Sequence, residues 1–160
     1  MKAYLDIETD RQGEISVIGI YTEPKGLVQL YGYDITAQNI ETVTGSARTI
    51  VTFNGDNFDL PLIKKNLNLD LRATHSSLDL FKEKKALGIK GGLKELEKRF
   101  GIARKTDGLN GYHAIKLWES YRQCGSLESL HLLLEYNGED VVNLIRLESC
   151  LANLKGKENG

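Results

Sequence analysis

The amino-acid sequence predicts a fold of the α/β class, or the related α+β class, built around one mixed sheet. Three strand-like segments open the chain, and the turns between them are short, so these strands should form an antiparallel meander. Helical patterns dominate the rest of the chain, interleaved with further strand-like segments. This order of elements is typical of helices that pack on a single sheet.

The first third of the chain carries most of the strands. Segments rich in β-forming residues predict four of them, at Lys2–Glu8, Ile15–Thr22, Leu27–Tyr33 and Thr49–Phe53. Turn signals separate the first three, at Arg11-Gln12-Gly13 and Pro24-Lys25-Gly26. A helix is expected around Thr36–Val43, and Asn54-Gly55 ends the fourth strand.

The second part of the chain is mainly helical. Leu60, Ile63 and Leu67 are spaced as on one face of a helix, which predicts a helix over Leu60–Leu67. Ser76–Leu80 is either a short fifth strand or the start of a helix. Three more helices are expected, at Leu93–Phe100, Tyr112–Gln123 and Leu127–Leu154.

A length of 160 residues suits one domain that buries its core without disulfides. We expect this domain to span residues 1–154, followed by a polar tail at 155–160, because Leu154 is the last apolar residue. Cys124 and Cys150 form no metal-ligand spacing and suit a reducing compartment, by default the cytoplasm. Acidic residues interrupt the first apolar run, so no signal peptide is expected, and no run is long enough to span a membrane.

The formal net charge is −1, but the charge is distributed unevenly along the chain. Residues 82–105 hold nine Lys or Arg against three Glu, a local charge of +6, whereas the flanking segments are acidic. A basic run of this kind is either a solvated helix face or a patch that follows a phosphate backbone. Both interpretations stay open from the sequence alone.

Two carboxylates lie close together on the first strand. Asp6 and Glu8 project from the same face, about 6 to 7 Å apart along the strand, because side chains alternate with a period of two. An unpaired carboxylate inside a domain costs several kcal/mol. The pair is therefore metal-bound, partly protonated, or located at an open end of the sheet.

Asp59 follows the fourth strand and precedes the next helix. That position is near a sheet end, where open α/β folds place their sites. The ordinary interpretation is a helix N-cap, since Asp is favoured there and Pro61 is acceptable in a first helical turn.

Tyr136 and Asp140 lie in the pattern of the last helix. Their spacing of four residues puts both on one face, close enough to serve one site. The ordinary interpretation is a core tyrosine and an exposed aspartate.

Together these residues resemble the DEDD-type 3′-5′ exonucleases of the ribonuclease H-like superfamily. The resemblance covers most of the chain, in the order of three motifs: Tyr4-Leu5-Asp6-Ile7-Glu8-Thr9, Asn54 to Asp59, and Tyr136 to Asp140. The third motif, Tyr-x-x-x-Asp, is that of the tyrosine branch. Further matches at Gly91 to Leu96 and Gly111-Tyr112 to Trp118 resemble the YprB-like group. The resemblance implies an α/β ribonuclease H-like fold, with a mixed five-stranded sheet flanked by helices.

The related branch of this superfamily has His five residues before the final Asp. Here that position is Glu135, and His131 is out of register. The sequence therefore resembles the tyrosine branch, and we expect His75, His113 and His131 to be structural or surface residues.

The resemblance also implies a two-metal site. Four carboxylates about 5 Å apart would repel by about 3 kcal/mol per ionised pair at an effective dielectric near 20, so they need counter-ions. Oxygen ligands favour Mg²⁺ or Mn²⁺, and two such ions can hydrolyse a phosphodiester. By resemblance, Asp6 would bridge both ions, Glu8 and Asp140 would complete the nucleophile-side ion, and Asp59 would hold the second largely through water. Tyr136 would position the attacking water.

The expected substrate is the single-stranded 3′ end of DNA or RNA, cleaved to nucleoside monophosphates. Thr9 and Phe58 are candidates for contact with the terminal nucleotide, although the ordinary interpretation of Phe58 is a core residue. Candidate contacts to the backbone are Lys84, Lys85, Lys90 and Lys94. Three alternatives stay open: a catalytically silent nucleic-acid-binding module, an endonuclease on the same fold, and a protein-interaction domain. The sequence indicates no membrane association and leaves protein partners unknown.

Overall fold

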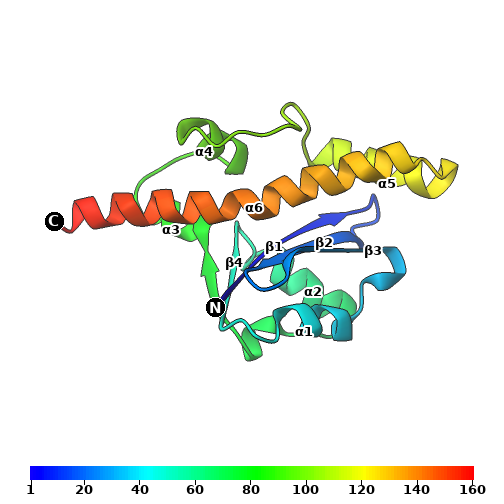
Figure 1. The fold of residues 1–160 in the computed structure, drawn as a ribbon, viewed down its shortest axis with the longest axis horizontal. Coiled ribbons are helices and arrows are strands. Elements are labelled where there is room, and N and C mark those ends of the chain that lie inside the picture. Colours follow the sequence, from blue (N-terminus) through cyan, green and yellow to red (C-terminus); the bar gives the residue numbers. More distant parts are fainter.

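The computed structural model describes residues 1–160 and contains one five-stranded sheet of order β3-β2-β1-β4-β5 (Figure 1). The strands are β1 Lys2–Thr9, β2 Ile15–Thr22, β3 Gly26–Tyr31, β4 Thr49–Thr52 and β5 Ser76–Asp79. β1 pairs with β2, and β2 with β3, in antiparallel fashion, whereas β1–β4 and β4–β5 are parallel. The predicted mixed sheet with an antiparallel meander is therefore confirmed.

Helices cover both faces of the sheet. They are α1 Ala37–Thr44, α2 Asp59–Leu67, α3 Leu80–Ala86, α4 Leu93–Arg99, α5 Gly111–Cys124 and α6 Leu127–Glu158. Two 3₁₀ turns, at Gly32–Asp34 and Leu71–Ala73, complete the elements. α1 and α2 pack on one face through a buried cluster of thirteen residues. α3 to α6 pack on the other, where the long α6 runs across the sheet (Figure 1).

Several elements differ from the sequence prediction by one residue at an end, and three segments differ by more. β3 ends two residues early, because Gly32 adopts a φ of +57° and begins a 3₁₀ turn. Ser76–Leu80 contains both a short strand and the start of a helix, because β5 ends at Asp79 and α3 begins at Leu80. The Asp79 carboxylate caps α3 by accepting from the Phe81 amide. α6 continues to Glu158, so most of the expected tail is helical. Lysines in its last turn favour this extension, since cations stabilise helix C-termini.

Small residues allow α6 to lie close to the sheet. A Cβ atom on Gly19 in β2 would come within 2.4 Å of Asn137 Oδ1 and 2.7 Å of Val141 Cγ2. A Cβ on Gly138 would lie 3.1 Å from Leu27 in β3. These two glycines therefore set the depth at which α6 meets the strands. None of the helices has the length and apolar character required to cross a membrane.

Candidate active site

The first strand presents different chemistry on its two faces. Ala3, Leu5 and Ile7 are buried against α1 and α2, as the strand period of two requires. Asp6 and Glu8 point to the opposite face, toward α6. β1 therefore presents two carboxylates on the face of the sheet that α6 covers.

α6 brings Asp140 to these two acids. One carboxylate oxygen from each of Asp6, Glu8 and Asp140 lies within 4.8 Å of the other two. Asp140 is only 6% exposed, so the interpretation as an exposed aspartate is wrong. Residues from the two ends of the chain thus form one acidic cluster.

Asp59 lies beside this cluster but outside the set of mutually close oxygens. It is buried at the first residue of α2, where Phe58 occupies the N-cap position, so the N-cap interpretation is wrong. Its Oδ2 instead accepts a hydrogen bond from the Ile7 amide at 3.1 Å. That amide is free because pairing between β1 and β4 stops at Tyr4 and Val51. The divergence of the two strands therefore creates the place for Asp59.

Burial among like charges raises the pKa of all four carboxyl groups. The pKa of Asp6 lies well above its ordinary value, mainly because of burial and secondly because of the neighbouring acids. Burial and the Asp140 charge raise the pKa of Glu8 to about 8. The pKa of Asp59 is raised to about 7, again mainly by burial. Burial also raises the pKa of Asp140, against the opposing effect of two nearby cations.

The donor set fits a hard divalent cation. The clustered ligand atoms are all carboxylate oxygens, with no His or Cys among them. Such ligands favour Mg²⁺ or Mn²⁺ over softer metals. A bound cation would also stabilise the ionised carboxylates, which burial alone disfavours.

Tyr136 and Lys94 adjoin the acids. Tyr136 lies one turn before Asp140 and is 3% exposed. Lys94 Nζ donates to the phenol oxygen of Tyr136 at 2.8 Å and lies 3.9 Å from Asp140 Oδ1. Burial, followed by the Asp140 and Glu8 charges, raises the pKa of Tyr136, which is therefore a neutral phenol. Lys94 thus lies at the acidic cluster itself.

Three residues that were not predicted from the sequence support Asp140. Arg104 Nη1 donates to Asp140 Oδ1 at 2.6 Å and to Glu97, which also accepts from Asn143 Nδ2 at 2.5 Å. Burial raises the pKa of Glu97, and these two donors oppose that rise. No local pattern could have paired these residues, because they come from α4, the following loop and α6.

Asn137 supports the first strand and was also not predicted. Its Nδ2 is 3.2 Å from both the carbonyl oxygen and Oδ2 of Asp6, and its Oδ1 accepts from Gln29 at 2.9 Å. Asn137 is fully buried beside Gly19. An isolated glycine within a strand often marks a place where another part of the chain comes close to the backbone. Gly19 was therefore the sequence signal that could have predicted the contact with Asn137.

The two residues proposed to contact the terminal nucleotide lie near the acids in sequence. Thr9 is partly buried at the end of β1, where the pairing with β2 shifts register between Glu8 and Thr9. Such bulges redirect side chains next to active sites. Phe58 is 49% exposed, so the interpretation as a core residue is wrong.

The basic run of residues 82–105 does not form one uniform patch. Lys84 is buried, with Nζ 4.4 Å from the centroid of the Phe81 ring. Lys85 and Lys90 are exposed, and both line a cavity of about 400 Å³ together with Lys84 and Phe81. The exposed lysines are therefore the members of this run that a polyanion could reach.

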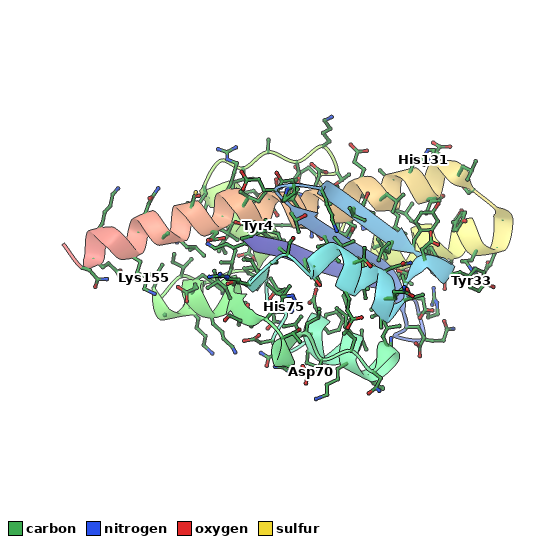
Figure 2. All side chains as sticks on the ribbon, turned by 60° about the horizontal axis from the view of Figure 1, so that its bottom comes forward. Tyr4, Tyr33, Asp70, His75, His131 and Lys155 are labelled. Atoms are coloured by element: carbon green, nitrogen blue, oxygen red, sulfur yellow. The ribbon has the colours of Figure 1, made fainter.

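The three histidines are absent from the acidic cluster. His75 and His131 lie far apart in Figure 2, one below the sheet and one near the start of α6. His75 Nε2 is 3.3 Å from the Thr44 carbonyl oxygen, and His113 forms a capping box with Asn110 at the start of α5. His131 is exposed, as is Glu135.

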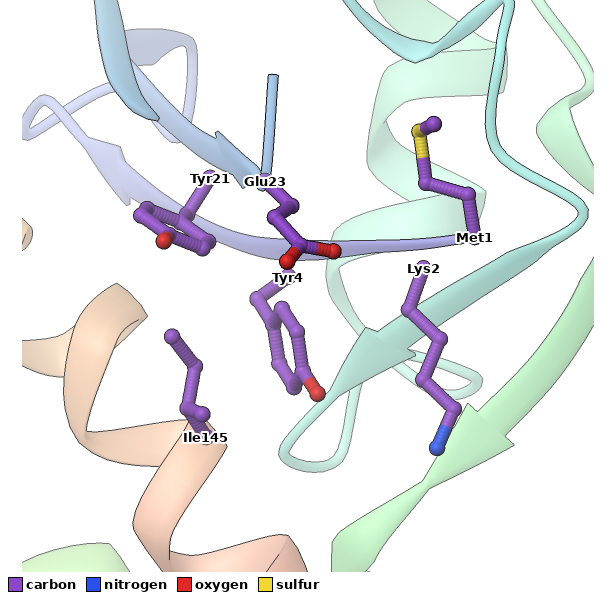
Figure 3. A pocket seen from close by; sticks show the side chains of 6 residues that line it. All are labelled: Met1, Lys2, Tyr4, Tyr21, Glu23 and Ile145. Atoms are coloured by element: carbon purple, nitrogen blue, oxygen red, sulfur yellow. The ribbon is translucent and has the colours of Figure 1, made fainter. Parts of the chain in front are cut away.

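A cavity of about 450 Å³ lies beside the first residues of β1 (Figure 3). Its lining side chains are Met1, Lys2, Tyr4, Tyr21, Glu23 and Ile145. The Tyr4 hydroxyl donates to Glu148 at 2.8 Å, and Lys2 pairs with the same carboxylate. None of the predicted site residues lines this cavity, so its size does not indicate the site.

A family model described as the RNase_H superfamily matches residues 3–152. The structure of the family B DNA polymerase from the hyperthermophilic archaeon Pyrobaculum calidifontis is similar, with TM-score 0.76 and 14% identity, covering 94% of this chain and 24% of the polymerase. A structure described as the apo form of a nuclease has TM-score 0.68 and 16% identity, covering 99% of this chain and 74% of that one. No curated protein matches the chain.

These likenesses concern the fold, because both identities are low. The chain spans only 24% of the length of the polymerase. The family match and the topology together confirm the predicted ribonuclease H-like fold.

Proposed function

Since this chain belongs to the RNase_H superfamily, we propose that it is a metal-dependent 3′-5′ exonuclease of the DEDD type, tyrosine branch, YprB-like group. The observation that carries the proposal is the meeting of Asp6, Glu8 and Asp140 within 4.8 Å, with Asp59 beside them. Nucleases of this superfamily generally use divalent metals. The buried acidic cluster supports such a requirement here.

Asp6, Glu8, Asp59 and Asp140 would hold two Mg²⁺ or Mn²⁺ ions. When bound, these ions supply an acidic water and stabilise the charge on the departing 3′ oxygen. The chain supports their ligands on rigid elements. The amide of Ile7 fixes Asp59, and the side-chain amide of Asn137 contacts Asp6.

Tyr136 would orient the attacking water by donating its phenol hydrogen. Its oxygen already accepts from Lys94, so the hydrogen is free to point toward a water or a carboxylate. With its raised pKa, Tyr136 acts as a donor and not as a base. Lys94 would also contact the scissile phosphate, because its ammonium lies at the acidic cluster.

The proposed substrate is a single-stranded 3′ end of DNA or RNA, and the products are nucleoside monophosphates. Exposed Phe58 precedes Asp59 directly and would stack on the terminal base, with Thr9 beside it. Lys85 and Lys90 would contact the phosphate backbone, whereas the burial of Lys84 favours a supporting role. We also propose a reducing compartment, in keeping with the two free cysteines.

The test uses single-stranded DNA and RNA of matched sequence, labelled at the 5′ end, with Mn²⁺, Mg²⁺ or EDTA. We expect a ladder of products shortened by single nucleotides from the 3′ end, dependent on metal and lost in Asp6→Asn. A circular single strand should resist cleavage. Cutting of the circle would instead indicate an endonuclease, and retention of the strand without cleavage would indicate a binding module.

A further inference from the structure

Glu97 is a fifth carboxylate near the site that the proposed chemistry does not use. It lies on α4 and is 1% exposed, which is unusual for an acid unless it is paired. Arg104 Nη1 lies 3.0 Å and 3.1 Å from its two carboxylate oxygens. Asn143 Nδ2 donates to Oε2 of the same group at 2.5 Å. Glu97 is therefore fully engaged inside the protein.

The same guanidinium nitrogen also holds Asp140. Arg104 Nη1 lies 2.6 Å from Asp140 Oδ1, and the Arg104 side chain is 4% exposed. Arg104 thus stands between two buried acids, one of which belongs to the proposed metal site. Its guanidinium also lies 5.3 Å from the centroid of the Tyr136 ring.

An arginine paired with Asp140 alone would compete with a metal. The guanidinium charge would neutralise the carboxylate and repel a divalent cation nearby, strongly so in a buried site. The Glu97 carboxylate balances the positive charge of the guanidinium, because it pairs with the same Arg104 nitrogen, Nη1, that contacts Asp140. The pair Arg104–Glu97 then orients Asp140 through a hydrogen bond while adding almost no net charge.

Other charges near the pair make no hydrogen bond to Arg104. Glu139 is the nearest further acid in charge terms, but its carboxylate accepts from the backbone amides of Lys105 and Thr106 and from the Thr106 hydroxyl. Lys98 and Asp107 line the adjoining cavity of about 260 Å³, but both are exposed and of opposite sign. Lys94 lies at 3.9 Å from Asp140 Oδ1 and adds positive charge, which increases the need for a balancing acid.

We propose that Glu97 is a positioning residue that balances the charge of Arg104, so that Arg104 orients Asp140 without displacing the metal. This inference rests on the proposed metal site. It assigns the ion triad Glu97–Arg104–Asp140 to the tuning of metal affinity, in addition to any contribution to stability.

The test measures Mn²⁺ binding to metal-free protein by calorimetry, with no need for activity. We expect Glu97→Gln to weaken Mn²⁺ binding about tenfold, in the range found when partners of metal ligands are removed. Glu95→Gln is the matched control, because it also replaces a carboxylate by an amide, at an exposed position of the same helix. The control should bind Mn²⁺ as the wild type does.

A double variant separates charge balance from structural support. Glu97→Gln combined with Arg104→Gln removes both charges, and we expect Mn²⁺ affinity within about threefold of the wild type. A structural role predicts that the double variant binds no better than Glu97→Gln, and this result would overturn the inference. If Glu97→Gln does not fold, the Mn²⁺ affinity of the double variant is compared with that of the wild type alone. An affinity within about threefold of the wild type supports the inference, and a weaker affinity overturns it.

Two outcomes distinguish failure of this inference from failure of the proposed function. Wild-type affinity in Glu97→Gln overturns the inference and leaves the proposed function standing. A wild-type protein that binds no Mn²⁺ overturns both.

Discussion

The ammonium of Lys94 donates a hydrogen bond to the phenol oxygen of Tyr136, with 2.8 Å between Nζ and Oη. Lys94 Nζ also lies 4.7 Å from the centroid of the Tyr136 ring. A phenol with a raised pKa and an occupied oxygen keeps only its hydrogen for other partners. Tyr136 is therefore suited to orient a water molecule. Most of the rate enhancement must then come from the proposed metal ligands.

This division predicts unequal losses in two variants. Tyr136→Phe should lower kcat about tenfold, the value of one hydrogen bond to a charged or polarised partner. Asp6→Ala should lower it on the order of a thousandfold, because several kcal/mol of charge stabilisation are lost with the metal. Single-turnover rates at saturating Mn²⁺ measure both. Equal losses would contradict the separate roles.

The acidic cluster should also limit the stability of the metal-free protein. Asp6→Asn removes one ionisable group from the acidic cluster and keeps an oxygen that can accept from Asn137. We expect a higher Tm than the wild type in EDTA, together with loss of activity, since active sites often trade stability for function. Thermal unfolding followed by circular dichroism measures this. A lower Tm in EDTA would mean that repulsion at the cluster is weak.

The raised pKa values predict how metal-free stability depends on pH. Glu8 and Asp59 have pKa values of about 8 and about 7 in the folded protein, so the folded chain holds protons that the unfolded chain releases. The free energy of unfolding should therefore fall as pH rises from about 5.5 to 8. Asp56 and Glu139, whose pKa values are lowered, are ionised in both states throughout this range and add no slope.

Urea unfolding in EDTA at several pH values in this range provides the measurement. Saturating Mn²⁺ should reduce the decline, because bound metal keeps the carboxylates ionised in the folded state. Stability that is constant or rises toward pH 8 in EDTA would contradict the raised pKa values.

The exposed ring of Phe58 gives a prediction about substrate binding. Phe58→Ala should raise KM for a single-stranded substrate about tenfold, since stacking of one base contributes about 1–3 kcal/mol. Tyr33→Ala is the control, because Tyr33 is 92% exposed and lies at the end of the sheet near β3 (Figure 2). A similar change in KM for both variants would show that Phe58 has no specific contact.

The sheet could be predicted because its signals are local. Strand alternation and turn residues lie within a few positions of each other, and Ile15–Thr22 was predicted to the residue. The same period places Asp6 and Glu8 on one face. Asp79 shows the limit of this approach: it ends a strand and caps a helix, and the sequence signals of the two roles overlap.

The site could be predicted only in part. Local spacing relates Tyr136 to Asp140, but it cannot bring α6 to β1, and the family resemblance supplied that expectation. The role of Arg104 could not be predicted from its place in a basic run, because its partners, Glu97 and Asp140, lie on two helices, α4 and α6, and not on the loop that carries it. Burial of Lys84 over Phe81 likewise depends on tertiary packing. Charge along a sequence does not tell which cations reach solvent.

Gly19 offers a test of how α6 is placed over the acids. A methyl group at Gly19 would come within 3 Å of both Asn137 and Val141, and neither is free to move, because Asn137 is bonded to Asp6 and Val141 is fully buried. Gly19→Ala should therefore lower the free energy of unfolding by about 1–3 kcal/mol, the usual cost of overpacking.

The shift should reach the proposed metal site, because α6 carries Asp140. We expect weaker Mn²⁺ binding in Gly19→Ala, measured by calorimetry beside urea unfolding. Gly156→Ala is the control, since Gly156 lies in the same helix and a Cβ atom there meets nothing within 4 Å. Wild-type stability and metal affinity in Gly19→Ala would show that the packing of α6 on β2 tolerates a methyl group. Asp140 would then keep its position without the close approach that Gly19 permits.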